Sequence, residues 1–192
     1  MIDKKSIISY NIVGERSLIM KFLKDNSVLD IQEAKVNDAD DILAFLKRVK
    51  DESQFIVLSD SGVNKSLEEQ KAYLEELKNK VTSKLFLGKV GGNLVASGGI
   101  YHREKSPEGN VVLDINVLND YLGLGTEEHM LNHVINYARI TAEIKSIDIL
   151  TTEDNQDMIS IYTRLGFKRI ENTQEDVSLN PESNEWIYRL II

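Results

Sequence analysis

Residues 115–131 read INVLNDYLGLGTEEHML: an apolar strand, a turn with two glycines and the start of a helix. Such a turn exposes backbone N–H groups beside the positive end of the helix dipole, which favours a phosphate or pyrophosphate. Gly123 and Gly125 can equally serve only a tight strand-to-helix connection, because glycine accepts backbone angles that other residues avoid. From these residues alone, both interpretations stay open.

Upstream of this stretch, the pattern predicts a strand, two helices and a hairpin. Val28–Lys35 is expected to be a strand, and Asn37 follows as the N-cap of a helix with apolar residues at helical spacing. Ser66 and Glu69 form a capping box, and the apolar face behind it predicts a second helix that includes Val81. The two hairpin strands are Leu85–Val90 and Leu94–Tyr101, joined by Gly91-Gly92.

Downstream, strands and helices alternate. Strand Val111–Val117 leads through the quoted turn into a helix, and Ile147–Thr151 is the next strand. These two strands are expected to be parallel because a helix crosses between them. Another helix ends at Gly166, and two closing strands lie near Phe167–Ile170 and Trp186–Leu190. The order predicts an α+β fold with a mixed sheet around one βαβ crossover.

Length and composition limit the class of protein. The 192 residues suit one domain: residues 1–28 are interpreted as an N-terminal extension packed on the domain, and residues 29–192 as the domain itself. A net charge of -8 disfavours a broad nucleic-acid-binding surface. The absence of cysteine excludes disulfides and thiolate chemistry. The apolar runs are too short for a membrane span and no signal peptide is visible, so a cytoplasmic protein is expected.

A second motif lies at residues 155–167, which read NQDMISIYTRLGF. Asn155 and Tyr162 are seven residues apart, close to two helical turns, so both can face one ligand groove. Taken alone, Tyr162 would more often be a core tyrosine, because its neighbours follow helical periodicity.

Together, the two motifs resemble the GNAT family of N-acetyltransferases over about Asp30–Ile170. The second motif is similar to the family's N-x-x-A/M-x-x-x-Y-x-K/R-x-G-F. The first is similar to its phosphate loop, V-x-P-x-Y-R/Q-G-x-G-x-G/A, which runs into a helix with a Leu-Leu pair. Two residues depart from the loop pattern, since Leu122 replaces Arg or Gln and Glu127 replaces the last Gly or Ala. The matching residues are Val117, Tyr121, Gly123, Gly125 and the Met130-Leu131 pair.

The resemblance implies a GNAT fold, with about seven strands in a central mixed sheet and flanking helices. Its two central parallel strands, the fourth and fifth of the family, would splay after a bulge and admit the pantetheine arm of acetyl-CoA. That arm would pair with the backbone of Ile115, Asn116 and Val117, and Asn155 would bond it from the other side. Tyr162 would protonate the departing thiolate. The phosphates would meet the N–H groups of Leu122, Gly123, Leu124, Gly125, Thr126, Glu127 and Glu128.

The acceptor implied by the resemblance is a primary amine, in a small molecule or a protein, that attacks directly in a ternary complex. The amine must first lose a proton, and Asp114 is the first candidate base, with His102 a weaker one. Asp114 can equally be a hydrogen-bonded strand residue. The acceptor pocket is expected from residues 52–65, 103–110 and 173–184, which carry no recognisable motif. Such folds commonly dimerise, so a homodimer is left open.

The sequence offers three alternatives. His129 and His133 stand four apart on one helix and could share a metal ion, but no third ligand lies nearby in the sequence. Gly123-x-Gly125-x-x-Glu128 imitates a dinucleotide fingerprint but lacks its third glycine. The main rival is a GNAT-fold protein that binds acyl-CoA or another ligand without transfer, which Leu122 and Glu127 motivate.

Overall fold

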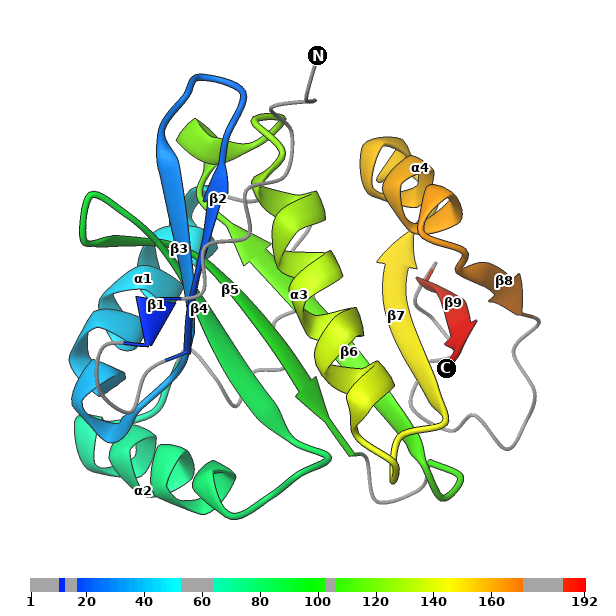
Figure 1. Cartoon of the computed structure of the whole chain (residues 1–192), viewed down its shortest axis with the longest axis horizontal. Helices are drawn as coiled ribbons and strands as arrows, with labels where there is room; N and C mark the ends of the chain where they lie inside the picture. The colour runs from blue at the N-terminus through cyan, green and yellow to red at the C-terminus, as the bar shows by residue number, and fades with distance from the viewer. Residues whose placement is uncertain (1–10, 13–16, 53–63, 103–105, 171–184) are drawn as a thin grey trace.

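A computed structural model of the chain describes residues 11–12, 17–52, 64–102, 106–170 and 185–192. Within these residues, nine strands form one sheet in the order β1-β2-β3-β4-β5-β6-β7-β9-β8 (Figure 1). Only β6 and β7 pair in parallel, and every other neighbouring pair is antiparallel. The strands are β1 (Asn11–Ile12), β2 (Ser17–Phe22), β3 (Val28–Glu33), β4 (Lys84–Val90), β5 (Asn93–Tyr101), β6 (Asn110–Val117), β7 (Ser146–Thr152), β8 (Lys168–Ile170) and β9 (Glu185–Ile191).

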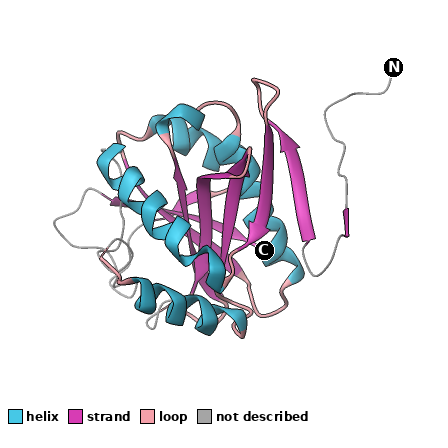
Figure 2. Ribbon diagram, turned by 90° about the vertical axis from the view of Figure 1, so that its left-hand side faces the viewer, coloured by secondary structure: helices cyan, strands magenta, loops and turns pink. Residues whose placement is uncertain are grey.

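Helices cover both faces of this sheet (Figure 2). Helix α3 lies over the large apolar core, where Met130, Leu131 and Val134 are fully buried. A smaller core between α1, α2 and β4 covers the other face, around Ile42 and Leu87. The α-helices in the described part of the chain are α1 (Ala39–Glu52), α2 (Leu67–Lys78), α3 (Thr126–Ile140) and α4 (Gln156–Arg164).

The predicted mixed α+β architecture is confirmed, and so are the predicted capping box at α2 and the β4–β5 hairpin. The Ser66 hydroxyl accepts the Glu69 N–H at 3.3 Å, while the Glu69 carboxylate accepts the Ser66 N–H at 2.7 Å. Gly91 and Gly92 take φ angles of 58° and 85°, which the tight β4–β5 turn requires. The predicted number of strands, about seven, is lower than the nine in the described sheet. The two additional strands, β1 and β2, come from the segment interpreted as an N-terminal extension.

Two helix boundaries differ from the sequence-based expectation. Asn37 is not an N-cap, because it lies inside a 3₁₀ turn, Val36–Asp38, that precedes α1. The Asp38 carboxylate accepts the Lys35 N–H at 2.9 Å, so the chain turns before Asn37 is reached. Helix α2 ends at Lys78 and so excludes Val81, which is 50% exposed.

Strands β6 and β7 part soon after they meet, as the family resemblance implies. They pair only from Asn110 with Ser146 to Val112 with Asp148, although β6 runs on to Val117. Beyond that point β6 continues to pair with β5, and β7 pairs with β9 along its whole length. The sheet therefore consists of two halves joined by three residue pairs.

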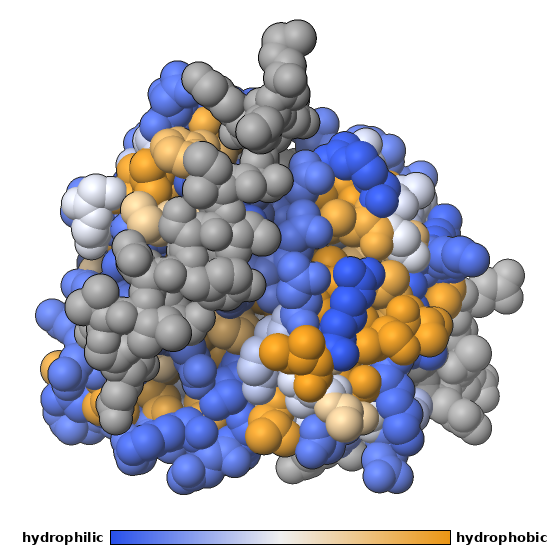
Figure 3. Space-filling view, in the orientation of Figure 1, coloured by the Kyte–Doolittle hydropathy of each residue, from blue (hydrophilic) through white to orange (hydrophobic). Residues whose placement is uncertain are grey.

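The bulge expected at this divergence is absent, because the β5–β6 ladder runs without a register shift. The shift recorded in the neighbouring ladder lies at Gly88 and Lys89 of β4. The divergence instead follows from the separate pairing of each strand with its outer neighbour. Arg189 of β9 reinforces this by donating two hydrogen bonds to the Asp148 carboxylate of β7, at 2.6 and 2.7 Å. Figure 3 shows apolar surface between α3 and the strands β7 and β9.

Candidate functional site

The glycine-bearing loop leads from the free end of β6 into α3. Gly123 and Gly125 have φ angles of 71° and 93°, and Gly125 is the N-cap residue of α3. These angles lie in the left-handed region, which residues other than glycine enter only at a cost. The first N–H groups of a helix lack intrahelical partners, so those of Thr126, Glu127 and Glu128 are available as anion donors.

Two of the expected phosphate donors are already hydrogen-bonded within the loop. The Leu122 N–H donates to the Asn119 carbonyl at 3.2 Å. The Gly123 N–H donates to the Glu127 carboxylate at 2.9 Å. Glu127 is only 6% exposed and forms no ion pair with a Lys or Arg in the described part of the chain. A pyrophosphate at the Gly123 amide would therefore have to displace this carboxylate.

The turn between β2 and β3 supports the loop from outside. The Lys24 ammonium donates to the Gly123 carbonyl at 2.7 Å, and the Lys24 N–H donates to the Leu124 carbonyl at 3.0 Å. This contact could not be predicted from the sequence, because Lys24 lies about a hundred residues from the loop, in a segment whose pattern predicts no single element. Its only local sign is the Asp25-Asn26-Ser27 turn, where Asn26 takes a φ of 68°.

The second motif lies across the divergence on α4. Asn155 is the N-cap residue of α4, three residues after the end of β7. Tyr162 is 6% exposed and packs against Phe167 and Tyr188, with ring centroids 6.0 and 6.2 Å away. Burial raises the pKa of the Tyr162 phenol, so it keeps its proton at neutral pH.

One ion pair links the two motifs. The Arg164 guanidinium at the end of α4 lies 2.8 Å from the Glu128 carboxylate in the first turn of α3. Both side chains are about half exposed, so the pair adds little stability. The pair shows that α3, which starts at the loop, and α4, which carries Tyr162, approach each other over the opening between β6 and β7.

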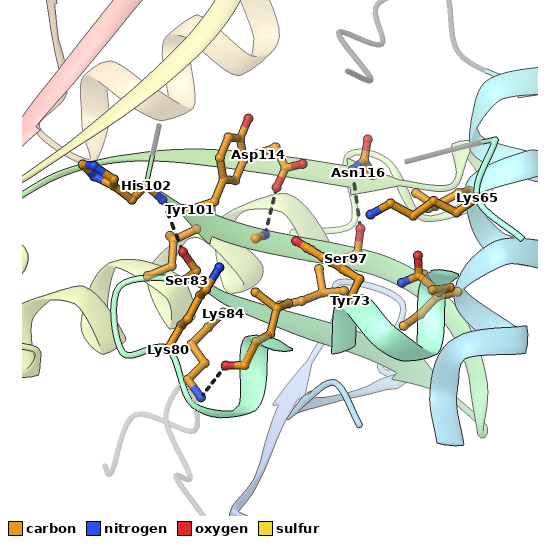
Figure 4. Close-up of a pocket in the computed structure, with 17 residues that line it drawn as sticks. Lys65, Tyr73, Lys80, Ser83, Lys84, Ser97, Tyr101, His102, Asp114 and Asn116 are labelled. Atoms are coloured by element: carbon orange, nitrogen blue, oxygen red, sulfur yellow. Dashed lines mark hydrogen bonds between the residues drawn. The ribbon is translucent and has the colours of Figure 1, made fainter. Parts of the chain in front are cut away.

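Asp114 lines a pocket of about 330 Å³ on the face of the sheet that α1 and α2 cover (Figure 4). Its Oδ1 accepts the Gly99 N–H of β5 at 3.1 Å. A Cβ at Gly99 would lie 2.6 Å from the same oxygen, so the Asp114 side chain would have to turn away from the Gly99 N–H. Tyr73 of α2 also lines the pocket, and burial, followed by the charge of Asp114, raises its pKa to about 12. Tyr73 is therefore a neutral hydrogen-bonding group near Asp114.

His102 lines the same pocket at the end of β5, and its Nδ1 lies 3.2 Å from the Asn110 carbonyl. Of the segments expected to form the acceptor pocket, residues 53–63, 103–105 and 173–184 lie outside the described residues. Lys65, from the first of these segments, does line the pocket. Tyr73 and Ser97 line it as well, although neither belongs to a segment predicted to do so. The glycine pair at residues 98 and 99, inside a strand, was the available sign that another group approaches the backbone there.

The two histidines weighed as metal ligands have other contacts. His129 Nε2 lies 3.2 Å from the Phe22 carbonyl, and His133 packs edge-on against Phe86 with ring centroids 4.6 Å apart. Burial, aided by the charge of Lys21, lowers the pKa of His133 to about 4. Within the described ranges, no group of three His, Cys, Asp or Glu side chains is arranged to hold a metal ion.

Comparison with known families fits this geometry. Residues 50–167 match the model of the acetyltransferase (GNAT) family, which is more than half of the chain. The chain belongs to the GNAT family. The matched residues of this GNAT protein include the parted parallel strands, the glycine-bearing loop and the α4 motif. No curated protein matches the chain. None of the helices described here is long and apolar enough to cross a membrane.

Solved structures share this GNAT fold at low sequence identity. A GNAT-family acetyltransferase from Streptococcus pneumoniae aligns with a TM-score of 0.74 and 21% identity, covering 85% of this chain and 99% of its own. The GNAT domain of S. lividans PAT aligns with a TM-score of 0.71 and 16% identity, covering 91% and 97%. A Salmonella typhimurium protein solved with its cofactor acetyl-CoA has a TM-score of 0.67 and 14% identity, covering 85% and 93%.

Proposed function

We propose that this GNAT protein transfers an acetyl group from acetyl-CoA to a primary amine. The observation that carries the proposal is the early end of β6–β7 pairing at Val112, with the glycine-bearing loop at the mouth of the opening. Family membership supports acetyl transfer in general. The related fold solved with acetyl-CoA from Salmonella typhimurium supports this donor.

The opening leaves backbone groups for the donor. Beyond Val112, one side of β6 is bonded to β5 and the other side has lost β7. Ile115, Asn116 and Val117 would pair with the amide groups of the pantetheine arm, as an added strand does. Asn155 would bond the arm from the α4 side. The phosphates would meet the amides from Leu122 to Glu128, with those of Leu122 and Gly123 giving up their present partners.

The chemistry requires a neutral amine and a stabilised leaving group. Asp114 would take a proton from the ammonium form, directly or through water, and the free amine would attack the thioester carbonyl. The C–N bond forms, the C–S bond breaks, and the thiolate leaves. Tyr162 is protonated at neutral pH and would donate to the sulfur as charge develops on it. The products are the acetylated amine and CoA, and no covalent enzyme intermediate is needed.

Tyr162→Phe tests the role of the phenol. We expect kcat to fall about 10²-fold or more, within the usual range for loss of a general acid. The Kd for acetyl-CoA should change less than about 2-fold, because the ring and its packing remain. Single-turnover rates and calorimetry measure the two quantities. An unchanged single-turnover rate would remove Tyr162 from the chemistry.

Calorimetry with acetyl-CoA, combined with a free-thiol assay over a panel of amines, tests the function itself. We expect micromolar binding and release of CoA that depends on an amine. No binding at high micromolar concentrations would overturn the proposal. Binding without turnover of any amine would support the second candidate, a GNAT-fold protein that holds acyl-CoA or another ligand without transfer. The Glu127 to Gly123 hydrogen bond is the observation that favours this rival.

A further inference from the structure

The pocket that Asp114 lines also contains a lysine, Lys65, that forms no ion pair among the described residues. Lys65 lines this pocket just before α2, and its ammonium lies 3.7 Å from the centre of the Tyr73 ring. Glu69 and Glu76 are close enough to act on its charge, but Glu69 is bound to Ser66 and Glu76 to Lys80. Burial lowers the pKa of Lys65, which shows that the charge is partly removed from water.

The other two lysines of the pocket are already paired. Lys80 binds Glu76, and Lys84 binds Glu33 at 2.7 Å and also donates to the Leu77 carbonyl. Among the described residues that line the pocket, Lys65 is therefore the lysine that an entering anion can pair with. Lys65 is partly shielded from water, so a ligand that supplies an anion gains from pairing with its charge.

Asp114 and Lys65 lie at different places along the pocket floor. In Figure 4, Asp114 lies beside Tyr101, whereas the Lys65 nitrogen points toward Ser97 and Asn116. Asp114 and Asn116 are two residues apart on β6, a separation of about 7 Å. The floor near Lys65 is polar, since the Asn116 side-chain amide lies 3.4 Å from the Ser97 hydroxyl. A ligand reaching both ends would carry its opposite charges a few bonds apart.

We propose that the acceptor of the proposed acetyl transfer is a small primary amine that also bears a carboxylate, as an amino acid does. Asp114 receives the amino group, and Lys65, with the polar groups of Ser97 and Asn116, receives the carboxylate. That this ligand is acetylated rests on the proposed function. That the pocket binds an amine with a carboxylate rests on the residues of the pocket alone. The volume of about 330 Å³ lies at the small end of ligand pockets, which suits a free small molecule. Ile42, Leu46 and Leu77 supply an apolar wall for its carbon skeleton.

Matched acceptors test this assignment. Initial rates of CoA release would be measured with amino acids, with the carboxamides of the same amino acids, with aliphatic diamines and with short peptides. We expect kcat/KM for the acids to exceed that for their carboxamides by about 10-fold to 100-fold, the usual range for a hydrogen bond to a charged group. Equal rates for acids and carboxamides, or better rates for diamines or peptides, would overturn the proposal.

Lys65→Met should lower kcat/KM for the acids to the level of the carboxamides and leave the carboxamide rates within about 2-fold. Lys65→Arg should keep part of the preference, because it keeps the charge. Lys78→Met is the matched control, since Lys78 lies on α2, is exposed, and does not line the pocket. A preference that survives in Lys65→Met would contradict the role of Lys65.

Binding measurements separate this inference from the proposed function. If acetyl-CoA does not bind, the transfer reaction fails, and calorimetry of the protein with the amino acids alone decides the ligand class. Binding that Lys65→Met abolishes would uphold it, and no binding by wild-type protein would overturn it. If acetyl-CoA binds and only amines without a carboxylate are acetylated, the function stands and the inference fails.

Discussion

Glu127 places a buried carboxylate where a GNAT loop would receive phosphate. Its negative charge opposes a second anion, and its hydrogen bond occupies the Gly123 amide. Glu127→Gln keeps an oxygen that can accept this N–H and removes the charge. We therefore expect Glu127→Gln to bind acetyl-CoA about 10-fold more tightly, with a smaller gain at high salt. Calorimetry at two ionic strengths measures both effects.

Glu143→Gln is the control for this comparison, because it makes the same change in net charge at an exposed position beyond the end of α3. Its affinity for acetyl-CoA should match that of the wild-type protein. If Glu127→Gln binds acetyl-CoA more weakly than wild type, the carboxylate supports the donor site instead of competing with the donor.

His133 makes the free energy of unfolding depend on pH, and a variant of this residue can measure its contribution. Its pKa is about 4 in the folded protein, against an ordinary value of 6.5, so the unfolded chain binds the proton more readily between these values. The contribution is fully present above about pH 6.5 and is lost as the pH falls toward 4. The expected loss is on the order of 2 to 3 kcal/mol. His133→Phe should flatten this part of the curve of unfolding free energy against pH, measured by urea denaturation. An unchanged slope would contradict the assignment.

Strands β5 and β6 work as a unit in positioning Asp114. Adding a Cβ at Gly99 would push the Asp114 carboxylate from its bond with the Gly99 N–H. We expect Gly99→Ala to lower turnover at least 10-fold by moving the Asp114 carboxylate, and to change the free energy of unfolding by less than about 1 kcal/mol, because the exposed Asp114 side chain can turn aside. Acetyl-CoA affinity should stay within about 2-fold, since the proposed donor contacts are backbone groups of residues 115–117 and not the Asp114 side chain.

Asp114→Asn removes the charge without adding an atom at Gly99. It should lower turnover, or move the pH–rate profile to higher pH. Retained turnover in both variants would show that Asp114 only holds β5 and β6 together.

The elements that could be predicted from sequence are those specified by nearby residues. The Ser66 and Glu69 capping box and the Gly91-Gly92 hairpin depend on contacts three residues apart or fewer, so their signals are readable. The start of α1 was misjudged because two side chains compete to define it, and Lys35 with Asp38 prevails over Asn37. The β2 strand was not predicted, because its short mixed pattern becomes a strand only through pairing with β3.

The same distinction applies to the candidate site. The two motifs were readable because each is continuous in the chain. The hydrogen bond between Glu127 and Gly123 joins residues only four apart. The sequence nevertheless indicates only that Glu127 replaces a small residue of the family pattern, and not the direction in which its carboxylate points. The pairing of Lys65 with the Asp114 pocket depends on how α2 packs on the sheet, and local patterns do not report that.

At the scale of the whole molecule, the sheet is two half-sheets, β1 to β6 and β7 to β9, joined by three residue pairs between β6 and β7. Arg164 with Glu128 is one further link between the halves, and it is exposed to solvent and salt. A donor bound in the opening would bond to both halves at once. Its effect should therefore be global stabilisation and not only local order.

This expectation gives a measurable shift in thermal stability. A ligand at 100 times its Kd stabilises the folded state by about 2.7 kcal/mol, and each kcal/mol moves Tm by about 2 to 4 °C for a chain of this size. Acetyl-CoA at that concentration should raise Tm by roughly 5 to 10 °C. Hydrogen exchange should slow most at residues 113–117 of β6 and 150–152 of β7, whose facing backbone groups no longer pair with each other. Stabilisation with protection confined to α1 and α2 would mean that the ligand occupies the Asp114 pocket and leaves the two half-sheets unbridged.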